Sequence, residues 1–466
     1  MVVFLPCVLT IYYIPLKGKR RLQNVFLLLA SLGFYAWGEP WFVFIMLASI
    51  IGNWGFGIWV DRVRESKSQS CLVIALMLVF NLSIIFVFKY LGFAVRTVNG
   101  IFGADITVPE IALPIGISFF TFQAISYVID VYREKGEMQK NLLNVGLYIS
   151  FFPQLIAGPI VRYETISDQI MGRKENWKDF SEGSCRFIVG LCKKVLLANN
   201  FALVADKAFA MGSVDACSTA FAWMGAIAYT LQIYYDFSGY SDMAIGLGRM
   251  FGFHFPENFN YPYISSSITE FWRRWHISLG SWFRDYVYIP LGGSRVGRGR
   301  LIINLFVVWL LTGIWHGANW TFICWGVMYG VLLTIEKLTG LEKRNIPDPI
   351  RHIYTMLFVI IGWVFFRADS LSCGMQMVEI MFGGRGAALM DANFRAYLSE
   401  NIYYFLFGIY FSMPIAPRIG AKLKKRFGED NIVITVLYCL LMTTGMLLSL
   451  SFLIKGAYNP FIYFNF

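Results

Sequence analysis

Charged residues are scarce in this chain of 466 residues: they make up 15% of it, and there are only four histidines. Residues of the hydrophobic set supply 57%, and the mean hydropathy is +0.56. This composition excludes an ordinary soluble globular protein. Apolar runs of ~17–25 residues, each long enough to cross a ~30 Å hydrocarbon layer as a helix, recur from end to end. We therefore predict an all-α, polytopic transmembrane helical bundle without a large soluble domain.

Several common functional motifs are also missing. The eight cysteines form no C-x-x-C pair, so neither a zinc site nor a disulfide scaffold is indicated. The chain has no Walker loop, H-E-x-x-H motif or G-x-S-x-G elbow, and the glycines at 246, 248 and 252 miss the dinucleotide spacing. The net charge of +11 comes from short Lys and Arg clusters between apolar runs, which indicates topology rather than nucleic-acid binding.

The basic clusters suggest an orientation in the membrane. They lie at 17–21, 62–67, 133–140 and 422–426. Two plausible crossings separate each of the first three clusters from the next, so we place the basic clusters in the cytoplasm and the N-terminus outside. The first apolar stretch has no features of a cleaved signal peptide and is expected to stay as a membrane segment. Crossings are predicted near 2–16, 22–37, 41–60, 71–90, 113–131, 141–157, 186–205, 219–235, 301–316, 319–337, 352–366, 402–414 and 432–454.

The region from about 236 to 300 is too polar for a span that faces lipid, so it is expected to line protein or water. It includes Asp236 and Asp242, which are intramembrane acids by position. Such acids are functional candidates. An alternative is that they pair with Arg249 or another arginine and hold the fold.

His316 is the first candidate for catalysis. It lies near the end of an apolar run, in the sequence Thr-Gly-Ile-Trp-His-Gly over 312–317. A neutral imidazole has an unperturbed pKa of ~6.5, which suits proton transfer near neutral pH. A buried histidine bonded to a backbone carbonyl is an equally good interpretation of the residue alone.

His276 lies in the short aromatic and basic stretch 271–279, which is amphipathic enough to lie at the cytoplasmic interface. Arg273 and Arg274 precede it. They are candidates to bind the phosphates of a nucleotide-like carrier, because guanidinium pairs with phosphate through two hydrogen bonds. The alternative is that they meet lipid headgroups or nearby acids. His254 and His352 have no polar constellation around them and stay unassigned.

Several strings together resemble the membrane-bound O-acyltransferase (MBOAT) family, specifically its bacterial branch for O-acetylation of alginate and other polysaccharides. The resemblance covers most of residues 25–370, and the ending Tyr458–Phe464 is also similar. The strings are PIGISFFTFQ at 114–123, YDFSGYSD at 235–242, FPENFNYPY at 255–263, WRRWHISL at 272–279, WFRDY at 282–286 and GIWHG at 313–317.

The resemblance implies one integral-membrane domain over 1–466, with a catalytic core at about 110–340 and C-terminal helices over 350–466. It implies a bundle around a central tunnel, with short interfacial or re-entrant helices. His316 then matches the catalytic histidine as general base, and His276 the second signature position, which orients the carrier or polarises the thioester carbonyl. The residues expected to bind the donor or line the tunnel are Trp272, Arg273, Arg274, Trp275, Trp315, Asp236 and Asn258.

The same resemblance implies a cytoplasmic thioester donor, acetyl-CoA, and no bound cofactor or metal. The acetyl group would pass to an extracytoplasmic partner of the SGNH type or to a polysaccharide hydroxyl, at a bacterial inner membrane. The segment Pro114–Gln123 differs from that of the D-alanyl transfer proteins, which favours acetyl over D-alanyl transfer. Transfer of D-alanyl or another acyl group to a wall polymer stays an alternative, as does a secondary transporter. An inactive scaffold of a polysaccharide-export complex ranks third.

Overall fold

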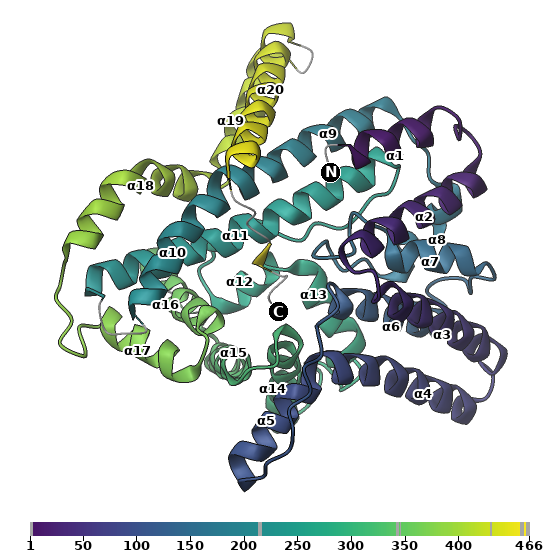
Figure 1. The fold of residues 1–466 in the computed structure, drawn as a ribbon, viewed down its shortest axis with the longest axis horizontal. Coiled ribbons are helices and arrows are strands. Elements are labelled where there is room, and N and C mark those ends of the chain that lie inside the picture. Colours follow the sequence, from purple (N-terminus) through teal and green to yellow (C-terminus); the bar gives the residue numbers. More distant parts are fainter. Residues whose placement is uncertain are drawn as a thin grey trace. The chain divides into compact units, whose positions relative to one another are not determined.

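A computed structural model describes residues 3–212, 217–341, 344, 346–428, 431–456, 461 and 462. Over these residues the regular structure is helical, with no strand (Figure 1). The prediction of an all-α fold is therefore confirmed. Most of the ending 458–464 lies outside the described residues.

The α-helices appear in the following order along the chain: α1 Phe4–Tyr13, α2 Arg20–Gly38, α3 Val43–Arg62, α4 Lys67–Ile85, α5 Leu91–Phe102, α6 Ile117–Tyr132, α7 Leu142–Ser150, α8 Tyr163–Gly172, α9 Trp177–Cys192, α10 Asn199–Gly212, α11 Thr219–Met250, α12 Ile268–Arg274, α13 Ile277–Phe283, α14 Arg298–His316, α15 Trp320–Thr339, α16 Asp348–Arg367, α17 Leu371–Met381, α18 Ala392–Phe411, α19 Ile415–Phe427 and α20 Ile432–Lys455. Among the described residues, the π-helical turns η1 Phe86–Tyr90 and η2 Lys193–Ala198 join successive helices, a third, η4 Arg284–Tyr288, follows α13, and a 3₁₀ turn, η3 Pro262–Ile264, precedes α12.

Among the described residues, seven helical segments are long and apolar enough to span a membrane. They are 43–62, 67–102, 177–211, 298–316, 320–339, 348–367 and 432–455. Every predicted crossing overlaps a helix, but the other six overlap helices that are too short or too polar to meet these limits. The chain is a multi-pass membrane protein.

Three predicted boundaries were wrong. The crossing expected at 141–157 is the nine-residue helix α7, followed by irregular backbone from Phe151. The helix expected at 71–90 continues through η1 to Phe102, inside the expected polar loop. Helix α11 runs to Met250, so Asp236 and Asp242 lie within a 32-residue helix and not beyond its end.

The described residues divide into two compact units. One comprises Met1–Ser184 and Ala244–Pro256, and the other Cys185–Met243 and Glu257–Phe466. In the first unit α3 packs against α4, α6 and α7, and α2 packs against α7. In the second unit α15 packs against α12, α14 and α16, and α10 packs against α17 and α18.

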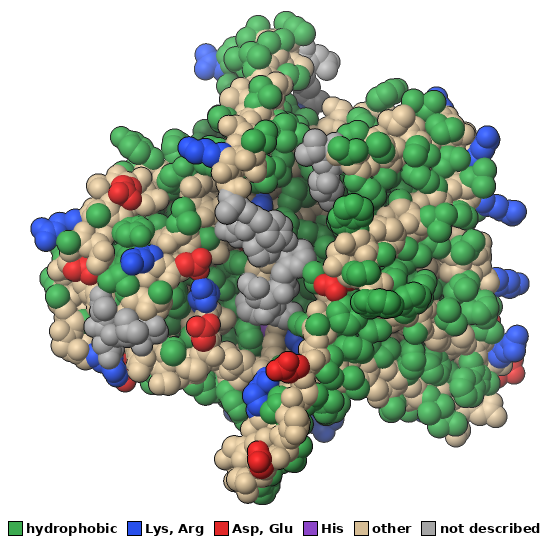
Figure 2. Space-filling view, in the orientation of Figure 1, with side chains coloured by type: hydrophobic (Ala, Val, Ile, Leu, Met, Phe, Trp, Pro, Cys, Tyr) green, Lys and Arg blue, Asp and Glu red, His purple; other side chains and the backbone are tan. Residues whose placement is uncertain are grey.

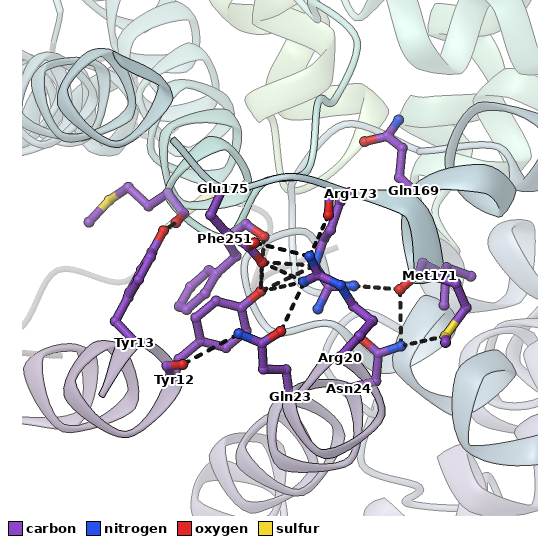
Figure 3. Close-up of polar contacts among 12 residues, drawn as sticks. Tyr12, Tyr13, Arg20, Gln23, Asn24, Gln169, Met171, Arg173, Glu175 and Phe251 are labelled. Atoms are coloured by element: carbon purple, nitrogen blue, oxygen red, sulfur yellow. Dashed lines mark hydrogen bonds and ion pairs between the residues drawn. The ribbon is translucent and has the colours of Figure 1, made fainter. Parts of the chain in front are cut away.

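A polar cluster in the first unit holds the N-terminal helices to the segment after α8 (Figure 3). Arg20 donates hydrogen bonds to Glu175 and, at 3.1 Å, to the hydroxyl of Tyr12. The buried Arg173 donates from Nε to the same hydroxyl at 3.2 Å, and its guanidinium lies 4.3 Å from the ring centroid of Phe253. Tyr12 in turn donates to Glu175. We call these four residues (Tyr12, Arg20, Arg173 and Glu175) the arginine cluster.

Hydrophobic side chains cover much of the visible surface, with few charged ones among them (Figure 2). On α20, for example, Ile432, Leu437 and Leu441 are each more than 60% exposed. Apolar surface on this scale is unfavourable in water, so these side chains belong in contact with lipid.

Candidate active site

Helices α14 and α15 pack at a contact made of glycine. A Cβ added at Gly313 would lie 2.5 Å from the backbone oxygen of Phe322, and one added at Gly326 would lie 2.5 Å from that of Trp309. Only glycine permits this close approach of two backbones. Gly313 and Gly326 therefore bring the two helices into backbone contact, and this contact fixes the end of α14.

His316 is the last residue of α14 and is 4% exposed. Its ring lies among aromatic rings: the centroids of Trp315, Trp325 and Phe366 are 4.9, 5.0 and 5.1 Å away. These surroundings exclude bulk water, and hydrogen bonds and charges act more strongly in such a site than in water.

His276 lies at a break between two short helices. Helix α12 ends at Arg274 and α13 begins at Ile277, so the amphipathic stretch expected over 271–279 is not one continuous helix. His276 has φ +47°, in the left-handed region, and is 2% exposed. A non-glycine residue in this conformation costs about 1–3 kcal/mol and persists only where its surroundings enforce it, often at functional sites.

The ring of His276 is held by a hydrogen-bond network around Asn258. Its Nδ1 lies 3.1 Å from Asn258 Oδ1. The same oxygen accepts hydrogen bonds from the backbone N–H and the hydroxyl of Ser278, at 3.2 and 2.8 Å. Asn258 Nδ2 donates to Ser241 Oγ at 2.9 Å, and the Asn258 carbonyl accepts from the Ile277 N–H. We call Ser241, Asn258, His276 and Ser278 the histidine network.

The second unit thus brings both predicted histidines to one aromatic cluster. The centroid of Trp315 lies 5.9 Å from that of His276 and 4.9 Å from that of His316, so both histidines lie next to the same indole. Trp272 belongs to the cluster through Trp325, at 5.4 Å.

Buried donors are a further property of this cluster. Trp272 Nε1, Trp325 Nε1 and Tyr329 Oη are buried and have no hydrogen-bond partner in the described part of the chain. A buried polar group without a partner costs about 1–3 kcal/mol. An acceptor group of a bound substrate would remove this cost.

The other predicted site residues lie in different surroundings. Trp275 is buried and packs against Trp363 at 4.7 Å. Arg273 is exposed. Arg274 forms an ion pair with Glu270 at 2.9 Å, which is the alternative we gave for it.

The two intramembrane acids both form ion pairs with basic residues. Asp236 pairs with Lys194 at 2.5 Å, and its second oxygen accepts a hydrogen bond from the Ile462 N–H. Asp242 pairs with Arg186 and Lys193, at 2.9 and 2.6 Å. The expected pairing with an arginine is confirmed for Asp242 through Arg186, whereas the arginine named, Arg249, pairs with Glu182 instead. Both acids therefore serve to hold helices together.

Sequence reasoning missed Trp325, Tyr329, Phe366, Ser241 and Ser278 as residues of the site. Trp325 and Tyr329 lie on α15, and Phe366 on α16. In an apolar helix the sequence does not distinguish an aromatic side chain that faces lipid from one that faces a functional site. Ser278 had one available signal, because it lies two residues after His276 in a string that carries the family resemblance.

Comparison with known proteins assigns the chain that carries this site to a protein family. The model of the membrane-bound O-acyltransferase family matches residues 138–378, about half of the chain, and includes both histidines. The chain belongs to the membrane-bound O-acyltransferase family and is an acyltransferase.

The chain is similar to named members of this family. It is 41% identical to the probable alginate O-acetylase AlgI of Pseudomonas putida, over 99% of this chain and 98% of that protein. It is 33% identical to the peptidoglycan O-acetyltransferase of Helicobacter pylori, over 95% and 91% of the two chains. It is 29% identical to the teichoic acid D-alanyltransferase of Bacillus subtilis, over 54% and 68%. The family assignment removes the transporter alternative, and these relatives support transfer of an acyl group to a polymer.

Proposed function

We propose that this protein is a membrane O-acetyltransferase that moves an acetyl group from a cytoplasmic thioester donor, acetyl-CoA, across a bacterial inner membrane for O-acetylation of an exported polysaccharide. The observation that carries the proposal is the pair of buried histidines next to Trp315. Similarity to alginate O-acetylases over nearly the full length favours acetyl over D-alanyl, because the D-alanyltransferase matches only about half of this chain.

In the proposed reaction His316 is the general base. It takes the proton of an acceptor hydroxyl while the hydroxyl oxygen attacks the thioester carbonyl. The tetrahedral intermediate then collapses, the carbon–sulfur bond breaks, and the thiolate leaves and takes the proton from His316. A thiol pKa of ~8.5 makes the thiolate a good leaving group, so one histidine suffices for this step.

The acceptor side is proposed to lie outside the cytoplasm, together with the N-terminus. There an SGNH-type partner receives the acetyl group or presents the polysaccharide. The basic clusters at 17–21, 62–67 and 133–140 support this orientation, since cytoplasmic loops carry an excess of Lys and Arg.

Arg273 and Trp272 are the residues we retain for the donor. Arg273 is exposed on α12, one turn from the histidine break, and is suited to meet a donor phosphate. Trp272, with Trp325, would border the thioester, and Trp315 would lie beside both histidines. Arg274, Asp236 and Trp275 are better explained as packing and pairing residues.

The test is thiol release by the purified protein in lipid nanodiscs supplied with acetyl-CoA, with and without a short polysaccharide acceptor and a soluble SGNH partner. We expect release in the wild type and a loss of about 10²–10⁴-fold in His316→Ala. His254→Ala is the matched control, because His254 is exposed and lies outside the second unit. Equal release by wild type and His316→Ala would contradict the proposal. Release only from a D-alanyl thioester would favour the alternative donor.

A further inference from the structure

The protonation of His276 follows from the orientation of Asn258. In the side-chain amide of an asparagine the oxygen accepts hydrogen bonds and the NH₂ group donates them. The groups around the amide therefore decide which of these two atoms lies on which side. The backbone N–H of Ser278 can only donate, and it points at Asn258 Oδ1 from 3.2 Å. The reversed amide would bring an NH₂ group against this N–H. The oxygen is therefore the atom that faces Ser278 and His276.

An amide oxygen only accepts hydrogen bonds, so the atom that faces it must donate. His276 Nδ1 lies 3.1 Å from this oxygen, a distance at which two bare acceptors would repel each other. The alternative donor to Nδ1 is the hydroxyl of Ser278. It is 3.5 Å from Nδ1 but only 2.8 Å from Asn258 Oδ1, to which it donates. Nδ1 therefore carries the hydrogen.

The neutral imidazole has one N–H, so Nε2 then presents a lone pair. Burial lowers the pKa of His276 to about 3, which keeps the ring neutral at physiological pH. In this form Nε2 accepts a hydrogen bond and has none to donate to a carbonyl or an oxyanion.

This distinction separates the two roles that the family resemblance left open for His276. A residue that polarises the thioester carbonyl must donate a hydrogen bond. A residue that orients the carrier can accept one. In the proposed reaction the hydroxyl proton goes to His316, so the remaining donor beside a thioester is the amide N–H of the pantetheine-type arm. Coenzyme A and a phosphopantetheine-bearing carrier protein share this arm.

We propose that Asn258 is a positioning residue that holds His276 as its Nδ1–H tautomer, and that His276 Nε2 accepts a hydrogen bond from the amide N–H next to the thioester of the donor. Ser241 and Ser278 support Asn258 from two sides. The left-handed backbone at His276 turns the ring toward Asn258 and Trp315. The part of the proposal that concerns the donor rests on the proposed function, whereas the tautomer does not.

The tautomer is tested by nitrogen NMR on the full chain in lipid bilayers. The protein is labelled with ¹⁵N-histidine and carries Gln at 254, 316 and 352, so that all signals come from His276. We expect a protonated Nδ1 and a non-protonated Nε2. In Asn258→Asp, which keeps an acceptor, the tautomer is retained, and in Asn258→Leu both tautomers appear. A protonated Nε2 in the chain with native Asn258 would overturn the proposal.

The contact with the donor is tested by comparing S-acetyl-pantetheine with an analogue in which the amide next to the thioester is an ester. The ester lacks the N–H and changes little else. We expect the wild type to lose roughly 3- to 10-fold in kcat/KM, the range for one ordinary hydrogen bond. His276→Gln is expected to use both donors equally poorly.

An equal loss in wild type and His276→Gln would overturn the contact. Failure of the wild type to use any acetyl thioester would instead overturn the proposed function, and the NMR result would still decide the tautomer.

Discussion

The arginine cluster of the first unit and the histidine network of the second are both buried or partly buried polar groups in an apolar protein, but one is charged and the other is neutral. The arginine cluster is charged: two guanidinium groups and a carboxylate exchange hydrogen bonds around the hydroxyl of Tyr12. The histidine network is neutral: an amide, two hydroxyls and an imidazole fix one another through hydrogen bonds.

The charged arginine cluster is suited to stabilise the fold, whereas the neutral histidine network is suited to take part in a reaction. Charges buried together stabilise only when each is paired, so every member of the arginine cluster is needed where it lies. Burial alone would raise the pKa of Glu175, but the hydrogen bonds from Arg20 and Tyr12 bring it below its ordinary value. In the histidine network three hydrogen bonds converge on Asn258 Oδ1, and this oxygen in the proposed tautomer leaves Nε2 of His276 as an acceptor. The predictions below test whether the two regions can be disturbed separately.

The largest effect is expected from Gly313→Ala. The added Cβ would lie 2.5 Å from the Phe322 backbone oxygen, so α14 must move away from α15 and carry His316 with it. A shift of about 1 Å at a reacting group can reduce the rate about 10²-fold, and overpacking costs about 1–3 kcal/mol.

The measurements for this variant are thiol release and the midpoint of thermal unfolding in nanodiscs. Gly299→Ala is the matched control, since it lies on the same helix with no atom within 4 Å of the added Cβ. Full activity in Gly313→Ala would mean that the glycine contact does not position His316.

Arg20→Met is expected to destabilise the protein by about 2 kcal/mol and to leave the rate per folded molecule unchanged. It removes charge-assisted hydrogen bonds to Glu175 and Tyr12, each worth roughly 1.5–3 kcal/mol when buried; we take the lower part of this range because Arg20 is partly exposed.

Thermal unfolding measures the effect, and Arg21→Met is the control, because Arg21 is exposed on the same turn of α2. If Arg20→Met instead lowers the rate at unchanged stability, the separation between the two regions fails.

Acidification is expected to weaken the second unit before it protonates the arginine cluster. His276 has a pKa of about 3 in the folded protein and ~6.5 in the unfolded chain. Between these values the unfolded state binds more protons, so stability falls as pH decreases from 6.5, by up to about 1.4 kcal/mol per pH unit. Glu175 adds its loss only near and below its ordinary pKa of ~4.3.

The measurement is the unfolding midpoint of wild type and His276→Gln between pH 7.5 and 5. The part of the slope that comes from His276 disappears in the variant, and identical slopes would contradict the assignment.

The sequence predicted which segments are helical better than it predicted where helices end and which distant side chains pair. Apolar runs of spanning length coincide with helices because each run must satisfy its backbone hydrogen bonds within the membrane. His316 was also accessible, because it ends an apolar run between glycines and belongs to a string with family resemblance.

Features that depend on distant parts of the chain could not be predicted from the sequence. Asn258 and Ser278 hold the ring of His276 in its left-handed backbone conformation, and the modest preference of histidine for this region is too weak to predict it. Asp242 pairs with Arg186, which is 56 residues away, and sequence proximity pointed instead to Arg249. Helix α7 ends at Ser150 within an apolar run, so hydropathy alone gave no boundary there.

The smallest expected effect is that of Tyr329→Phe, which removes a buried hydroxyl that has no hydrogen-bond partner in the described part of the chain. An unused hydroxyl in this position would only cost free energy, so its removal would leave activity unchanged and raise stability slightly. We expect activity to fall about 3- to 10-fold, because a bound substrate supplies the missing acceptor. Stability is expected to stay equal or to rise by less than about 1 kcal/mol.

Tyr403→Phe is the control, since Tyr403 is 70% exposed. The ratio of kcat to KM with acetyl-CoA decides between the two outcomes. A loss confined to Tyr329→Phe would extend the contrast drawn above: in the second unit a polar group is kept incomplete until substrate binds, whereas in the arginine cluster the carboxylate of Glu175 already has its partners.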